Sequence, residues 1–219
     1  MRNNNQPRTK TILALTESLP FFNSNNLAPV EKNKTYLKVI FSRYAKSGKL
    51  LRLKKGFYVT KSYVDESQKN GSFSSYLEFL ANVLYRPSYL SLDYVLYQHN
   101  LITELPVNYT LVTSNKTACF MNKLGRFFYR TIKKDLFCGF KITTEGDFTI
   151  LKATKTKALF DFLYLRKNLL IDKRAIEELR FNLNTLTAKD INELKKYVNL
   201  EGSRKMESIF KSLIQLWKQ

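Results

Sequence analysis

Along the first sixty residues, apolar positions recur at helical spacing in two segments and then change to the alternation of two short strands. A first helix is predicted over Thr9–Leu19, where Pro20 ends the pattern. A second is predicted over Asn33–Ser47, with an apolar face repeating every three or four residues. That face consists of Leu37, Ile40, Phe41 and Tyr44. The other side of this second helix is polar and faces solvent or a ligand.

A basic hairpin is predicted directly after the second helix. Gly48 stands where a glycine ends a helix, and Lys54-Lys55-Gly56 joins the strand-like runs Leu50–Leu53 and Phe57–Thr60. The order of helix, turn, helix and basic hairpin is typical of a winged helix-turn-helix domain. We therefore predict such a domain over residues 9–66.

The remaining pattern predicts a second, mixed domain over residues 72–219. The polar stretch Tyr63–Ser72 lacks periodicity and is interpreted as a linker, whereas Met1–Arg8 is interpreted as a disordered basic arm. Helices, then strands, then helices follow in blocks, so the fold class is α+β. The first helices are expected at Ser74–Leu84 and, capped by Ser91, at Ser91–Gln98. The strands are expected at Tyr109–Thr113, Thr117–Met121, Phe127–Ile132, Leu136–Ile142 and Phe148–Lys152, and the last helices at Thr156–Lys167, Asp172–Phe181, Thr187–Tyr197 and Ser203–Trp217.

The distribution of charge along the chain indicates what kind of partner the protein binds. The 219 residues carry a formal net charge of +19. The first 64 residues hold 13 of the 37 basic residues but only 2 of the 18 acidic ones, so the field is densest in the predicted helix-turn-helix domain. Such an excess indicates a polyanionic partner, which we expect to be double-stranded DNA.

Several other classes are disfavoured. No run of about 18 apolar residues predicts a membrane span, and the polar Met1–Lys10 segment is unlike a secretory signal, so a cytoplasmic protein without a membrane partner is expected. Cys119 and Cys138 are too few for a disulfide framework or a metal site, and their aromatic neighbours predict buried thiols. We expect no cofactor.

No residue of the sequence is assigned a catalytic role. His99 is the only histidine, at a predicted helix end where a capping or surface role is favoured, and no phosphate-binding glycine motif is present. Scattered acids leave a metal-dependent nuclease open as an alternative. Asp161 lies on an apolar helix face, where a carboxylate needs a partner, and structural pairing is the favoured explanation. The chain is therefore not expected to be an enzyme.

Candidate DNA contacts lie on the polar face of the second helix and on the hairpin. Arginine and hydroxyl side chains can read base edges in the major groove, whereas lysines on flexible stems suit phosphates. The base-reading candidates are Thr35, Ser42 and Arg43, and the phosphate candidates are Lys34, Lys38 and Lys46. The hairpin candidates are Arg52, Lys54, Lys55 and Tyr58. A solvated helix face with an ordinary hairpin is the alternative.

A tyrosine-rich segment, Tyr85–Ile102, leaves two interpretations open: a binding surface, or core packing with tyrosine hydroxyls reaching the surface. This segment, together with Tyr109–Thr113, Tyr129–Lys133, Phe137–Phe140 and Thr156–Leu165, resembles the AbiEi antitoxin family of transcriptional regulators. The similarity extends over roughly residues 9–167. Its motif residues in the second domain are Tyr85, Arg86, Tyr89, Ser91, Asp93, Lys157 and Asp161.

The resemblance implies a winged helix that represses its own operon by binding inverted repeats in the promoter. It also implies a second domain that neutralises a nucleotidyltransferase-like toxin in an abortive-infection (phage defence) system, without enzymatic activity. One departure concerns Thr156, which stands where the family commonly has an acid before Lys157. A protein- or RNA-interaction module with a basic surface is the alternative function.

Overall fold

The computed structural model describes residues 6–218, which divide into two compact units. The first unit comprises residues up to Leu77 together with Phe120–Gly125, and the second comprises Glu78–Cys119 and Arg126 onward. The boundary after Leu77 falls inside a helix. Each unit is described separately below.

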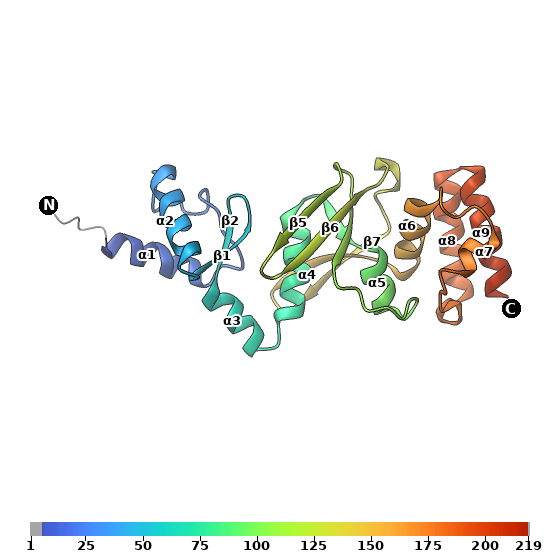
Figure 1. Ribbon diagram of the computed structural model, residues 1–219, viewed down its shortest axis with the longest axis horizontal. Coiled ribbons are helices and arrows are strands. Elements are labelled where there is room, and N and C mark those ends of the chain that lie inside the picture. Colours follow the sequence, from blue (N-terminus) through green and yellow to red (C-terminus); the bar gives the residue numbers. More distant parts are fainter. Residues whose placement is uncertain (1–5, 219) are drawn as a thin grey trace. The chain divides into compact units, whose positions relative to one another are not determined.

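The first unit is built on two helices and a hairpin (Figure 1). Helix α1 (Gln6–Glu17) and α2 (Lys34–Lys46) precede strands β1 (Leu50–Lys54) and β2 (Phe57–Thr60), which pair antiparallel. Gly48 and Gly56 have φ of +77° and +80°, so the predicted helix stop and hairpin turn are confirmed. The core gathers Ile12, Phe22, Leu27, Leu37, Ile40, Phe41 and Leu50.

Two predictions for this unit are wrong. The polar stretch expected to be an irregular linker contains helix α3 (Lys61–Lys69), because Thr60 caps its first turn and Val64 and Ser67 give it a buried side. The predicted disordered arm overlaps α1, since residues 6–8 are helical, and its residues 1–5 lie outside the described part of the chain.

The second unit contains most of a mixed sheet with helices packed around it, as the α+β prediction requires. Of the elements named next, residues 73–77 and 120–122 belong to the first unit. The strand order is β5-β6-β4-β3-β8-β7. The strands are β3 (Ser88–Leu90), β4 (Tyr109–Thr113), β5 (Ala118–Asn122), β6 (Gly125–Thr131), β7 (Phe140–Glu145) and β8 (Phe148–Ala153). The helices are α4 (Phe73–Leu84), α5 (Leu92–Gln98), α6 (Lys155–Arg166), α7 (Lys173–Glu177), α8 (Ala188–Glu201) and α9 (Arg204–Trp217).

Three details of this unit differ from the predictions. The central strand β3 was not predicted at all, because only three residues of the tyrosine-rich segment form it. The expected strand Leu136–Ile142 begins only at Phe140, after a 3-10 turn at Lys134–Leu136. The helix expected over Asp172–Phe181 is confined to α7, although Asp172 caps it. The other predicted helices and strands of this unit are present within a few residues.

Helix α6 lies at the centre of the unit. Every residue from Thr156 to Leu163 is buried, so the helix is enclosed on all sides and carries its polar residues inside. It packs against α5 and α8, and its N-terminus follows β8 directly. This position makes the polar residues of α6 the natural place to look for a structural or functional cluster.

Candidate functional site

Helix α2 presents a basic face. Asn33 starts the helix by accepting a hydrogen bond from the Tyr36 backbone N–H at 3.0 Å, and Leu37, Ile40 and Phe41 turn into the core. The opposite side is exposed to solvent and includes all six α2 residues predicted to contact DNA: Lys34, Thr35, Lys38, Ser42, Arg43 and Lys46. Apart from Lys34, these residues line a shallow hollow along the helix. The face is therefore contiguous.

One residue of this face was given no role by the sequence. Val39 lies among the basic side chains, lines the same hollow and is 61% exposed. An isolated exposed valine is common on protein surfaces. At the middle of a basic helix face, however, its methyl groups are the type that contacts a thymine methyl in the major groove. Val39 was not a candidate because the candidates were chosen among polar side chains.

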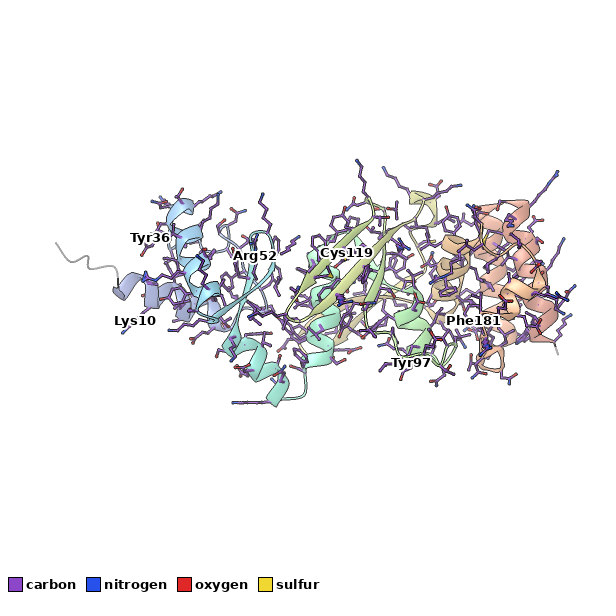
Figure 2. The ribbon with its side chains drawn as sticks, in the orientation of Figure 1. Lys10, Tyr36, Arg52, Tyr97, Cys119 and Phe181 are labelled. Carbon is purple, nitrogen blue, oxygen red and sulfur yellow. The ribbon has the colours of Figure 1, made fainter. Side chains whose placement is uncertain are left out.

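The hairpin candidates differ in how free their side chains are. Arg52 and Lys55 are exposed, and Figure 2 labels Arg52 on the hairpin. Lys54 is half-buried, with Nζ 4.1 Å from the ring centroid of Phe57 and 5.7 Å from that of Phe120, and burial lowers its pKa. Tyr58 packs its ring 5.0 Å from Phe41. On the hairpin, Arg52 and Lys55 are therefore accessible to a ligand, whereas Lys54 and Tyr58 are only partly accessible.

The second unit holds a buried polar cluster around Asp161. The Nζ of Lys157 pairs with Oδ1 of Asp161, and both side chains are wholly excluded from solvent. The other carboxylate oxygen, Oδ2, accepts hydrogen bonds from the Ser91 hydroxyl at 2.8 Å and the Tyr89 hydroxyl at 3.0 Å. Structural pairing of Asp161 is thus confirmed. The expectation that Ser91 caps α5 with its side chain is wrong, because its hydroxyl bonds Asp161 instead.

Aromatic rings enclose the ammonium group of this pair. The Nζ of Lys157 lies 4.9 Å from the ring centroid of Phe160, 5.5 Å from Tyr197 and 5.7 Å from Tyr89. Burial raises the pKa of Asp161 above its ordinary value, although the Lys157 ammonium and the hydroxyls of Ser91 and Tyr89 oppose that rise. The cluster has no accessible surface for a partner. Its hydrogen bonds and ion pair hold α6 against β3 and the residue that follows it.

The other three motif residues lie nearer the surface. Tyr85 packs edge-on against Tyr129 at 5.3 Å, Arg86 is exposed, and Asp93 pairs with Arg166 at 3.4 Å. Both side chains of that pair are 34% exposed. The structure therefore brings Tyr89, Ser91, Lys157 and Asp161 together in one buried cluster. Tyr85, Arg86 and Asp93 lie outside this cluster and are half-buried or exposed.

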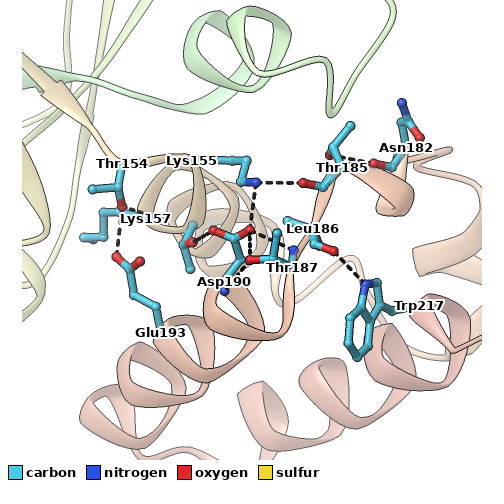
Figure 3. A network of polar contacts seen from close by, with 11 residues as sticks. Thr154, Lys155, Lys157, Asn182, Thr185, Leu186, Thr187, Asp190, Glu193 and Trp217 are labelled. Carbon is cyan, nitrogen blue, oxygen red and sulfur yellow. Dashed lines mark hydrogen bonds and ion pairs between the residues drawn. The ribbon is translucent and has the colours of Figure 1, made fainter.

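A second polar network joins the beginning of α6 to that of α8, with Lys155 facing Asp190 (Figure 3), and Thr156 takes part in it. Its hydroxyl donates to Oδ1 of Asp190 at 3.3 Å, and Lys155 Nζ lies 2.7 Å from Oδ2 of Asp190. Partial burial acts to raise the pKa of Asp190, but hydrogen bonds from Lys155 and Thr187 outweigh it and lower the pKa to about 2. An acid at position 156 would face this carboxylate with like charge. Threonine instead supplies a donor.

The residues considered for catalysis lie apart. His99 is exposed and forms the C-terminal cap of α5 through its backbone N–H. Cys119 is exposed on β5 (Figure 2) and Cys138 is half-buried, so the prediction that both thiols are buried is wrong. Across residues 6–218, no three His, Cys, Asp or Glu side chains are grouped so as to hold a metal ion. Within the same residues, the helices are too short or too polar to cross a bilayer.

No protein-family model matches this chain, and no curated protein sequence matches it.

Proposed function

We propose that this chain is a DNA-binding transcriptional repressor whose first unit acts as a winged helix-turn-helix domain. In this proposal α2 enters the major groove, and the β1–β2 hairpin is the wing that meets the phosphates. Arg43, Ser42 and Thr35 read base edges, while lysines on the same face fix position and supply affinity.

One observation carries the proposal. The chain from Asn33 to Thr60 contains eight basic residues and no acid, and the side chains of α2 that face away from the core form one exposed, contiguous surface. A solvated helix face in a protein usually mixes both signs of charge. A surface of one sign, on a helix that ends at a basic hairpin, is complementary to a duplex phosphate backbone.

The role as an antitoxin is part of the same proposal and rests on the resemblance to the AbiEi family. Because Tyr89, Ser91, Lys157 and Asp161 are buried, these motif residues would hold the fold of the second unit rather than touch a toxin. We expect a reading frame next to this gene to encode a nucleotidyltransferase-like toxin. Co-expression of this chain should restore growth to cells that express the toxin. Growth arrest that persists would contradict the antitoxin role but not the repressor role.

A gel shift on the DNA upstream of the gene tests the repressor. The matched variants are Arg52→Ala with Lys55→Ala on the hairpin, and Lys195→Ala with Lys196→Ala on α8, since all four side chains are exposed and each double variant removes two charges. The hairpin variant should weaken binding to every sequence and reduce the salt slope by about 2, because each lost phosphate contact removes about 0.9 from it. The α8 variant should bind as the wild type does. Equal losses in both variants, or wild-type binding indifferent to salt, would refute the assignment.

A further inference from the structure

The open face of the sheet in the second unit contains a hollow of about 600 Å³. Along β6, Phe127 and Tyr129 are buried on one side, so the alternating residues Phe128 and Arg130 lie on the other side. Both line the hollow, which the end of α6 and the beginning of α5 complete. None of the proposed DNA contacts takes part in it.

The charge balance of the hollow is positive. Two guanidinium groups, Arg130 and Arg166, line it beside a single carboxylate, Asp93. Among residues 6–218, Arg130 is exposed and makes no side-chain hydrogen bond or ion pair, whereas Arg166 holds Asp93 at a long 3.4 Å. The Arg130 guanidinium, which is not committed to a carboxylate, suits a phosphate, which it can bind through two parallel hydrogen bonds.

The rest of the lining suits a planar, partly apolar group. Phe128 offers a ring, and Leu92, Leu165 and Leu169 supply apolar walls. Leu92 has φ of +59°, an uncommon backbone conformation for leucine that is often found at ligand sites. A bare inorganic anion would leave this apolar surface unused.

Hydrogen-bonding groups stand at the edges of the same hollow. The hydroxyls of Thr117 and Thr131 lie 3.1 Å apart, next to Arg130. The side-chain Oδ1 of Asn108 is buried and has no hydrogen-bond partner among the described residues. A buried acceptor without a donor is unfavourable, and rotation about χ2 of asparagine is soft, so a donor on a ligand can satisfy this oxygen.

We propose that this hollow is a binding site for a nucleoside 5′-monophosphate. The phosphate binds Arg130 and Arg166, the base stacks on Phe128, and an N–H or hydroxyl of the nucleoside donates to Asn108. Stacking of a base on an aromatic side chain beside a basic residue is a general mode of nucleotide recognition. The site lies in the second unit and does not rest on the DNA-binding proposal.

Isothermal titration of the full chain with adenosine 5′-monophosphate tests the site. We expect a dissociation constant of about 1 mM or tighter, with adenosine and inorganic phosphate each at least about tenfold weaker, since each lacks one half of the contacts. Arg130→Ala should weaken binding of the monophosphate about tenfold or more, and Phe128→Leu should weaken it several-fold. Thermal unfolding of each variant checks that the fold is retained.

Two control variants separate this site from general attraction to a basic protein. Lys141→Ala removes an exposed charge on β7 outside the hollow, and Arg43→Ala removes one from the basic face of α2. Both should bind the monophosphate as the wild type does. The proposal is overturned if Arg43→Ala abolishes binding while Arg130→Ala does not, if inorganic phosphate binds as tightly as the nucleotide, or if no binding is seen up to about 5 mM, several-fold above the expected dissociation constant.

Discussion

Lys157 and Asp161 form an ion pair one turn apart on α6, and neither side chain has any solvent-exposed area. Removing two charges from water is unfavourable, and their attraction offsets the cost only when further hydrogen bonds satisfy them. Here Ser91 and Tyr89 bond the carboxylate, while three aromatic rings surround the ammonium group. Because Ser91 and Tyr89 come from the β3 region, the pair fixes how α6 packs against the sheet.

Breaking this pair on one side should be strongly destabilising. We expect Asp161→Ala to lower the free energy of unfolding by about 3–5 kcal/mol, because it leaves an ammonium group buried without a counter-charge. Replacing both partners, as Lys157→Met with Asp161→Leu, should cost far less, since no charge remains buried. Urea unfolding of the single and double variants measures both values, and Asp93→Ala, at a pair that is one-third exposed, should cost only about 1 kcal/mol or less.

The same double variant tests how the family motif acts. If Lys157 and Asp161 serve the antitoxin role through the fold, the folded double variant should protect cells from the toxin about as well as the wild type. The unstable Asp161→Ala variant should protect poorly, with lower protein levels in the cell. A double variant that is stable but does not protect would instead show that these residues act directly in neutralising the toxin.

Gly139 explains why the aromatic rings can approach Lys157 so closely. A Cβ atom at this position would lie 2.8 Å from the Tyr197 ring and 2.9 Å from the Lys157 side chain, and its φ is +73°. We expect Gly139→Ala to lower the unfolding free energy by about 2–4 kcal/mol, combining overpacking with left-handed backbone strain. Gly146→Ala is the matched control, because its φ is +57° and nothing lies within 4 Å. It should cost only about 1 kcal/mol of strain, and equal thermal shifts for the two variants would show that crowding at Gly139 is unimportant.

The first unit could be predicted well because its signals are local. The apolar face of α2, the positive φ of Gly48 and Gly56, and the strand alternation each depend on neighbours within a few residues. Helix α3 was missed because its polar composition hides the cap at Thr60 and the single buried apolar side chain of Val64.

The second unit could be predicted only in part because its decisive contacts are distant in sequence. The position of Asp161 on an apolar helix face predicts that its carboxylate has a partner, and Lys157 stands four residues before it. Ser91 and Tyr89, which also bond this carboxylate, are some seventy residues away in the sequence. Strand β3 was missed for a similar reason, because it has only three residues and is held by pairing with β4 and β8, which lie further along the chain. The hollow beside Phe128 was not foreseen either, because it is formed by α5, α6 and the sheet together.

Asp190 should make stability depend on acid pH. Its pKa is lowered from an ordinary 3.8 to about 2 by the hydrogen bonds from Lys155 and Thr187, which outweigh its partial burial. The ionised carboxylate therefore contributes stability above pH 3.8, and this contribution is lost as pH falls towards 2. After allowance for screening by solvent we expect a contribution of about 1 kcal/mol. Urea unfolding of the wild type and Asp190→Asn between neutral pH and pH 2 should show a stability difference that shrinks over this range. A difference that is the same at all pH values would contradict the prediction.

Base reading by α2 should be separable from phosphate binding by α2. Arg43→Ala should reduce discrimination at one base pair of the upstream DNA by about 1–3 kcal/mol, because it removes a side chain able to contact guanine through two hydrogen bonds. Val39→Ala should weaken preference for a thymine by a smaller amount, without changing the salt slope, since it removes only methyl contacts.

Lys38→Ala is the control for these two variants, because its side chain lies on the same exposed face but suits a phosphate. It should weaken binding uniformly across sequences and reduce the salt slope by about 1. Competition binding against a set of single-base-pair variants of the upstream DNA distinguishes the three patterns. If Arg43→Ala behaves as Lys38→Ala does, α2 contacts only the phosphate backbone, and base reading must be assigned to other residues.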